Sequence, residues 1–134
     1  MLLYTITLIF QVLTKMKDLL LGSNHDLVIQ NYDFVLTTDS QALAQRIKQS
    51  LLFIKGEWFF NENIGTEYYP YIADKDLGIL KATIANAIRE VKGVKELIDF
   101  NANVDGKTRT MSVAFEVIDD LDNLIQSNID NVRI

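Results

Sequence analysis

The 134-residue chain has no cysteine and only one proline, one histidine and one tryptophan. Without cysteine there is no disulfide framework, no thiolate metal site and no cysteine nucleophile. A single histidine argues against a zinc site, since zinc in proteins is held mainly by cysteine and histidine. No phosphate-binding glycine loop and no regularly spaced calcium loop is visible. We therefore expect neither a metal nor a cofactor.

Positive charge is also scarce. The chain has 13 Lys and Arg residues against 18 Asp and Glu residues, which gives a net charge of −5 and an isoelectric point near 4.7. Nucleic-acid-binding proteins usually carry a basic face, and anionic membrane surfaces attract clusters of basic residues. We therefore expect no nucleic-acid partner and no binding to an anionic membrane surface.

Residues 1–15 are apolar but lack the features of a signal peptide, which are a basic start and a small-residue cleavage site. The run is also shorter than the roughly 20 residues that span a bilayer. Three interpretations stay open: an element that packs on a neighbour, an upstream extension with Met16 as the natural start, or a membrane anchor.

We expect one domain over residues 16–134, because 49% aliphatic and aromatic residues suffice for a core.

Two amphipathic helices are predicted. The first starts at Thr38, where Thr38 and Gln41 have the spacing of a capping box, and ends at Gly56. Its apolar stripe is Leu43, Ile47, Leu51 and Ile54. The second starts after Asp74 and stops at Gly93, and its apolar residues recur with a helical period: Leu77, Leu80, Ile84, Ile88 and Val91.

The remaining chain predicts strands. Two short apolar runs, 27–29 and 34–36, suggest a hairpin, and residues 57–60 suggest an aromatic strand. Asp105-Gly106 predicts a hairpin turn between residues 94–104 and 108–118. The inward residues are expected to be Ile98, Phe100, Ala102 and Val104 on the first strand, and Met111, Val113, Phe115 and Val117 on the second. After Ile118 we expect a short helix or an interaction tail, so the fold class is α+β, with two helices on a small antiparallel sheet that ends in a β-hairpin.

Glu57 is the best candidate for an acid catalyst, because Trp58 beside it could form an apolar wall that favours the protonated carboxyl group. A glycosidase needs two carboxylates across a cleft. A chain with 18 acidic residues always has carboxylates close in sequence, and nothing here fixes such a pair. Trp58 is more simply a core residue or an interface anchor, and Trp58 with Tyr68, Tyr69 and Tyr71 could form a contact face.

The order of several short motifs carries a resemblance. Leu36-Thr37-Thr38-Asp39 is followed by a helix with Gln45, then by Lys55-Gly56-Glu57-Trp58-Phe59, Gly65, the pair Tyr68-Tyr69, a second helix, Gly93-Val94 and Phe100. This order resembles the baseplate-wedge proteins of contractile phage tails, which are called sheath initiators and sometimes described as lysozyme-like. The resemblance covers residues 26–118.

The resemblance implies a structural, non-enzymatic part that templates the first sheath ring on the baseplate by sharing β-strands with sheath subunits. The implied partners are sheath subunits, other baseplate wedge proteins and tail-tube proteins. Assembly would take place in the bacterial cytoplasm, and the final location would be the baseplate of a phage tail, a type VI secretion system or an extracellular contractile particle.

Many relatives carry Glu-Pro-Arg at the end of the second helix, where this chain has Glu90-Val91-Lys92. The expected interface residues are Glu57, Trp58, Glu90, Lys92, Met111, Val113, Phe115 and Val117, with the last four on the strand expected to supply backbone pairing. Lysine cannot reproduce the planar fork of an arginine, so the contact made there differs from that of the relatives.

The alternatives are a peptidoglycan-degrading glycosidase that uses Glu57 and an unrelated small adaptor domain.

Overall fold

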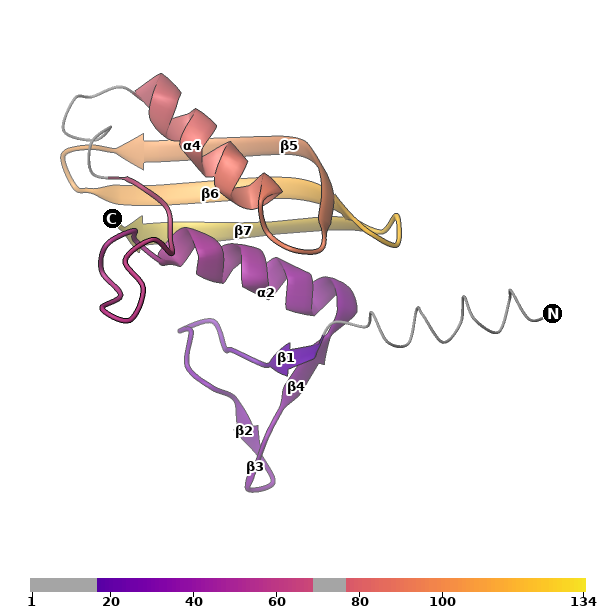
Figure 1. Cartoon of the computed structure of the whole chain (residues 1–134). Coiled ribbons are helices and arrows are strands. Elements are labelled where there is room, and N and C mark those ends of the chain that lie inside the picture. The colour runs from indigo at the N-terminus through magenta and orange to yellow at the C-terminus, as the bar shows by residue number, and fades with distance from the viewer. Residues whose placement is uncertain (1–16, 69–76) are drawn as a thin grey trace. The chain divides into compact units, whose positions relative to one another are not determined.

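The computed structural model describes residues 17–68 and 77–134 of an α+β chain (Figure 1). The backbone divides into two compact units, Met1–Leu43 and Ala44–Ile134, and the boundary falls inside the first described helix. Residues 1–15, expected to be an N-terminal extension, and Asp74, expected to start the second helix, lie outside the described residues.

The described part of the first unit consists of short antiparallel strands, followed by the start of the first described helix. β1 (Lys17–Leu19) pairs with β4 (Leu36–Thr38), and β2 (Ile29–Gln30) pairs with β3 (Asp33–Phe34). Asn31 and Tyr32 connect β2 to β3 with φ values of 51° and 64°. Positive φ at both central residues is the requirement of a type I′ turn, which matches the twist of the two strands. The hairpin expected from the two apolar runs is therefore confirmed.

The helix α2 (Asp39–Leu52) begins and ends close to its expected bounds. Its buried side chains are Ala42, Leu43, Ile47 and Leu51, which confirms most of the predicted stripe. The helix stops before Ile54, and Gly56, with a φ of 92°, lies in the turn that follows and not at the helix end. The reason is that residues later in the chain bind the last carbonyl groups of α2, as described below.

The helix α4 (Leu77–Arg89) buries Leu80, Ile84, Ala85 and Ile88 on one face. The helical period of the apolar residues therefore predicted the second helix correctly. After the helix the chain turns through Gly93, whose φ is 108°, into the first strand of the main sheet.

The main sheet has three antiparallel strands: β5 (Val94–Asp105), β6 (Thr110–Asp119) and β7 (Leu124–Arg133), in the order β5-β6-β7. The hairpin β5-β6 was predicted, but the prediction of a helix or tail after Ile118 was wrong. Asp119 explains the difference, because its carboxylate accepts bonds from the N–H groups of Leu121 (2.9 Å) and Asn123 (2.8 Å) and holds a tight turn. The acidic segment is that turn, and the chain returns as a third strand.

A β-bulge changes which residues of β5 face the core. Leu97 pairs with Val117 and Asp99 pairs with Glu116, which leaves Ile98 as the extra residue between them. Alternation along a strand is interrupted at such an insertion. Ile98 is consequently 47% exposed, so its predicted inward position was wrong, whereas Ala102 is buried as expected.

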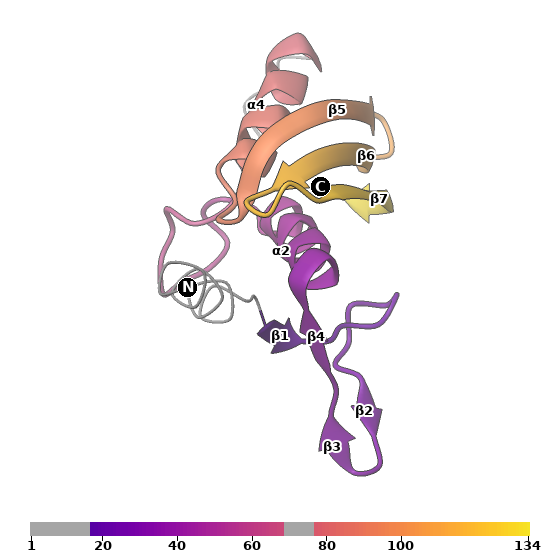
Figure 2. The same ribbon diagram turned by 90° about the vertical axis from the view of Figure 1, so that its right-hand side faces the viewer.

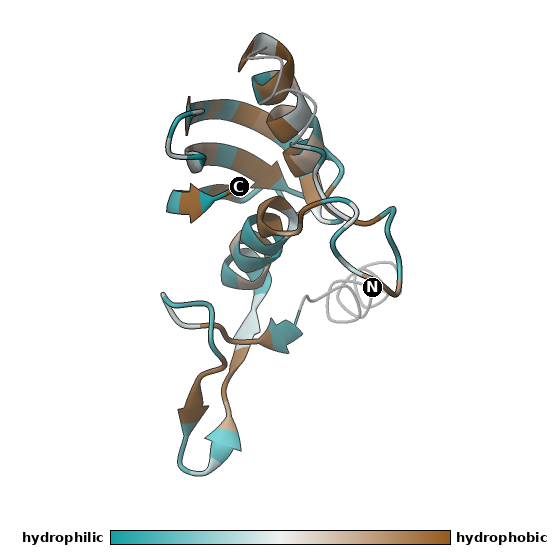
Figure 3. Ribbon diagram, turned by 90° about the vertical axis from the view of Figure 1, so that its left-hand side faces the viewer, coloured by the Kyte–Doolittle hydropathy of each residue, from teal (hydrophilic) through white to brown (hydrophobic). Residues whose placement is uncertain are grey.

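Within the second unit, α4 and the part of α2 from residue 44 onward lie on the same face of the β5-β6-β7 sheet (Figures 1 and 2). Hydrophobic and hydrophilic bands alternate along the strands in Figure 3, as expected for a sheet with one buried and one solvated face. The buried side chains of β6 and β7 are Met111, Val113, Phe115, Val117, Ile125 and Ile129. The opposite face, here called the outer face, carries mainly polar side chains.

Candidate protein-interaction site

Residues 53–66, here called the aromatic loop, leave the end of α2 and return to it. The Lys55 N–H donates to the Thr66 carbonyl (3.0 Å), and the Thr66 N–H donates to the Phe53 carbonyl (2.8 Å). Inside the loop, the Gly56 N–H donates to the Glu62 carbonyl (3.1 Å). A compact loop whose two ends meet in this way is an Ω-loop, a class that is frequently functional.

The strand predicted over residues 57–60 was wrong. The Glu57 N–H donates to the Ile54 carbonyl (3.2 Å) and the Asn61 N–H donates to the Trp58 carbonyl (3.0 Å). Bonds between residues three apart close turns, so the segment folds back on itself and offers no extended edge.

Gly65 closes the loop at a point that has no room for a side chain. Its φ is 114°, and an added Cβ would lie 2.7 Å from the carbonyl oxygen of Phe53 and 2.8 Å from the nitrogen of Lys55. Glycine is therefore required both for the backbone conformation and for the close approach of the two loop ends.

One side chain at the end of the loop and one just after it bind the end of α2. The hydroxyl of the fully buried Tyr68 donates to the Leu51 carbonyl (2.6 Å), and the hydroxyl of Thr66 donates to the Ser50 carbonyl (3.2 Å). The last four carbonyls of a helix have no partner within the helix. Burial raises the pKa of Tyr68 to about 12, against a smaller lowering by its hydrogen bond with Thr66. Tyr68 is thus a core residue, while Tyr69 and Tyr71, its expected partners in a contact face, lie outside the described residues.

Large apolar side chains cover the surface of the aromatic loop. Phe59 and Phe60 are 78% and 74% exposed, and Trp58 is 39% exposed. The ring centroids of Phe59 and Phe60 are 4.0 Å apart, and Trp58 lies 5.9 Å from Phe60 and 6.2 Å from Phe53. Contiguous exposed apolar side chains on a soluble domain mark a site for contact with another molecule.

Glu57 lies on the surface of the same loop and is exposed, as are the nearby carboxylates of Glu62 and Glu67. An acid catalyst of the glycosidase type would instead need an enclosing apolar pocket and a second carboxylate across a cleft. The structure therefore brings Glu57 and Trp58 together on an exposed loop, which is an arrangement suited to binding.

Glu90 and Lys92 follow the end of α4 and are both exposed. The Glu90 N–H still donates to the Asn86 carbonyl (3.0 Å), so this residue prolongs the helical hydrogen bonding by one step. Gly93 then reverses the chain into β5. The two charged side chains are therefore displayed at a well-defined corner between a helix and a sheet.

The four predicted contact residues of β6 are in the core. Met111, Val113, Phe115 and Val117 are each at most 4% exposed. Moreover, β6 is the central strand and is paired on both sides, with β5 and with β7. Among the described residues, the strands of this sheet with one unpaired backbone edge are β5 and β7, which differs from the prediction that residues 108–118 would supply the pairing edge.

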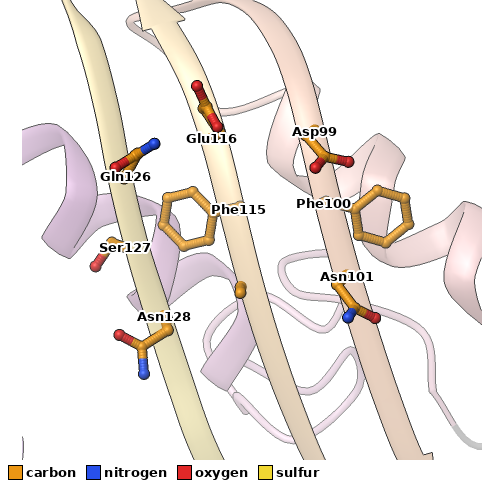
Figure 4. Close-up of a pocket in the computed structure, with 9 residues that line it drawn as sticks. Asp99, Phe100, Asn101, Phe115, Glu116, Gln126, Ser127 and Asn128 are labelled. Atoms are coloured by element: carbon orange, nitrogen blue, oxygen red, sulfur yellow. The ribbon is translucent and has the colours of Figure 1, made fainter.

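Sequence reasoning singled out no residue of the outer sheet face, where the structure has a hollow of about 380 Å³. Figure 4 shows Asp99, Glu116 and Gln126 on three neighbouring strands of this hollow. The alternation of Asp99, Asn101 and Asn103 with apolar residues was the signal available in the sequence.

The β2-β3 hairpin was predicted, but not its surface. The apolar side chains that it displays are all at least half exposed: Ile29, Tyr32 and Phe34. Ile29 pairs directly with Phe34, so these two share one face of the hairpin.

Residues 17–68 and 77–134 contain no group of three or more histidine, aspartate or glutamate side chains placed to hold a metal ion. Over the same residues, no helix combines the length and the apolar character that crossing a membrane requires.

Comparison with protein families supports one of the interpretations of the sequence. The family model of the contractile injection system sheath initiator matches residues 17–122, which is most of the chain. The chain belongs to the sheath initiator family. No curated protein matches the chain significantly.

The match to the sheath initiator family confirms the resemblance seen in the motif order. It spans the described part of the first unit, both described helices, the aromatic loop, β5 and β6, and it ends just before β7. Sheath initiators are structural proteins that work with sheath and baseplate components of a contractile injection particle.

Proposed function

We propose that this sheath initiator is a non-enzymatic baseplate subunit that starts the sheath by sharing a β-strand with a sheath subunit. The observation that supports the proposal is the three-stranded sheet, whose outer strands β5 and β7 each pair on one side only within the described residues. An unpaired strand edge presents a row of backbone donors and acceptors to which another chain can add a strand.

The edge of β7 is better suited to strand addition than the edge of β5. β5 has two irregularities in its ladder and carries four charged side chains from Lys95 to Asp105 along its length. Bulges and charges are the usual means by which proteins protect an edge. Residues 124–129 of β7, in contrast, pair regularly with β6 and contain no charged side chain.

The hydrogen-bond pattern indicates which backbone groups of β7 point outward. The Asp119 N–H donates to the Asn123 carbonyl (3.0 Å), so this pair is hydrogen-bonded across the strands. Hydrogen-bonded and non-hydrogen-bonded pairs alternate along an antiparallel ladder. The N–H and C=O groups of Leu124, Gln126 and Asn128 therefore point away from β6, toward the place of an added strand.

The remaining contact residues fit a second role at the baseplate. Glu57, Trp58, Glu90 and Lys92 are exposed and lie on a loop and a helix end, outside the sheet. We assign them to contacts with neighbouring wedge proteins. The core of the strand-sharing sheet is formed by Met111, Val113, Phe115 and Val117. The particle would assemble in the bacterial cytoplasm, and the final location of the protein would be the baseplate.

Gln126→Pro tests the strand-sharing proposal. Proline removes an N–H that points outward, and proline is tolerated at such edge positions because the ladder with β6 does not use that donor. The variant should fold and yet fail to start sheath polymerisation with purified sheath subunits, as followed by electron microscopy. Gln126→Ala is the matched control and should start sheaths normally.

Amide hydrogen exchange with and without the sheath subunit locates the contact. Exchange should slow at residues 124–129 on binding, whereas β6 should show no change because both its edges are already paired. Normal sheath initiation by a folded Gln126→Pro variant, with no slowed exchange on either outer strand, would refute strand sharing.

A further inference from the structure

The tip of the aromatic loop carries two exposed phenylalanine side chains. We propose that Phe59 and Phe60 insert together into an apolar pocket on a neighbouring baseplate protein, and that the rim of that pocket carries Lys or Arg. The inference rests on the proposed function only in placing the partner in the same particle, and it uses a surface separate from the β7 edge.

Phe59 and Phe60 are the two most exposed phenylalanine side chains among the described residues. Their ring centroids are only 4.0 Å apart, with an angle of 35° between the ring planes, so the two rings act as one apolar unit. A partner that buries this unit gains more binding free energy than it would from two separate side chains. Aromatic anchors of this kind dominate the binding energy of protein interfaces.

Trp58 packs against Phe60 and Phe53. It is half as exposed as Phe59, and its ring lies between those of Phe53 and Phe60, at 6.2 and 5.9 Å. The sequence pointed to Trp58 as the anchor, but the exposed area favours Phe59 and Phe60 as the inserting groups. Trp58 then fixes the orientation of Phe60.

The loop is held in shape before any partner arrives. The backbone bonds between Lys55, Thr66 and Phe53 close its base, and Gly65 allows the two ends of the loop to approach closely. A rigid loop loses little conformational entropy when it binds, so more of the burial energy appears as affinity.

Charge around the tip indicates the kind of partner. The exposed charged side chains of the loop are Lys55, Glu57 and Glu62, and Glu67 follows directly, so acidic groups outnumber the single basic one. Electrostatic complementarity then calls for a positive rim on the partner. The same charges disfavour a bilayer, since aromatic segments that enter membranes are normally accompanied by Lys and Arg.

The test measures binding of the full-length protein to each purified wedge, tube and sheath subunit of the same particle. The variant carries both Phe59→Ser and Phe60→Ser. The control is Tyr32→Ser, which removes an even more exposed aromatic ring from the β2-β3 turn. Because all three side chains are exposed, the melting temperatures should stay within about 2 °C of the wild type.

We expect the double variant to weaken binding to one wedge protein by about 30-fold or more, the range of an interface hot spot, and the control to change it less than about twofold. Glu62→Lys should weaken the same binding, and the loss should shrink as salt is raised. A photo-reactive phenylalanine at position 60 should crosslink to apolar residues of that subunit that are flanked by Lys or Arg.

Unchanged binding by the double variant, or binding of the wild type to none of the subunits, would overturn the proposal. So would flotation of the wild type, but not of the double variant, with vesicles of phosphatidylcholine and phosphatidylglycerol. The experiments distinguish the two proposals. Gln126→Pro should leave binding to the wedge protein intact. Loss of sheath initiation without loss of wedge binding would test the role of the β7 edge alone.

Discussion

Replacing Tyr68 with phenylalanine should destabilise the protein although every carbon atom of the side chain is kept. The Tyr68 hydroxyl is buried and donates to the Leu51 carbonyl at 2.6 Å, at the end of α2. Without this donor a buried helix-terminal carbonyl loses a partner, which costs about 1–3 kcal/mol. With an unfolding entropy of about 2.1 cal/mol/K per residue, the melting temperature of a chain of this size should fall by about 4–11 °C.

The pH dependence of this stabilisation has a definite sign. The pKa of Tyr68 is raised from 10.0 to about 12 in the folded state, mainly by burial. The unfolded state therefore loses its proton first as pH rises, and the unfolding free energy decreases between pH 10 and pH 12. Two pKa units correspond to about 2.7 kcal/mol, so the advantage of the wild type over Tyr68→Phe should be constant below pH 10 and disappear near pH 12.

The assay is urea unfolding of both proteins from pH 7 to pH 12, with Tyr32→Phe as the control. Tyr32 is fully exposed, so its hydroxyl can be removed without a stability change. Equal stability of Tyr68→Phe and the wild type at pH 7 would refute the reasoning about the helix end. A difference that persists unchanged through pH 12 would refute the assignment of the raised pKa.

Three further predictions concern the turns and the sheet, all measured by chemical denaturation. Gly56→Ala should lower the free energy of unfolding by about 1–2 kcal/mol, because alanine is strained at a positive φ. Gly65→Ala should lower it further, because at this position the new Cβ would also meet backbone atoms, the nearest 2.7 Å away. Equal losses would contradict the close approach. Met111→Ala should cost about 2–5 kcal/mol by opening a cavity, whereas Ile98→Ala on the bulge should cost under about 1 kcal/mol; the reverse order would place Ile98 in the core. Two backbone N–H groups of the turn after Asp105 donate to its carboxylate and lower its pKa. The contribution of Asp105 to the free energy of unfolding should therefore be present at neutral pH and be lost as pH falls. The stability difference between the wild type and Asp105→Asn should shrink in acid.

The parts of the fold that depend on local periodicity were predictable. Leu80, Ile84 and Ile88 repeat with the helical period and lie on the buried face of α4. The alternation from residue 110 to residue 119 likewise gave the buried face of β6 correctly. Both patterns are local, because consecutive turns or pleats of one element carry the whole signal.

β7 was missed because its pattern is ambiguous when read alone. Ile125 and Ile129 are four residues apart, which suits one face of a helix as well as a strand. Only the turn held by the Asp119 carboxylate and the pairing with β6 select the strand. The inward position of Ile98 failed for a related reason, since a bulge depends on the partner strand and leaves no mark in the sequence.

The candidate contact surface was also predictable from the sequence only in part. The sequence alone showed an aromatic run at residues 58–60 between two glycines, and the order of motifs indicated the family that the family model then confirmed. The tertiary structure decided that Phe59 and Phe60 point to solvent, that Tyr68 is buried and that β6 has no free edge. Residue type and spacing determine what each element can bury, but exposure and strand order arise from contacts between residues far apart in the chain.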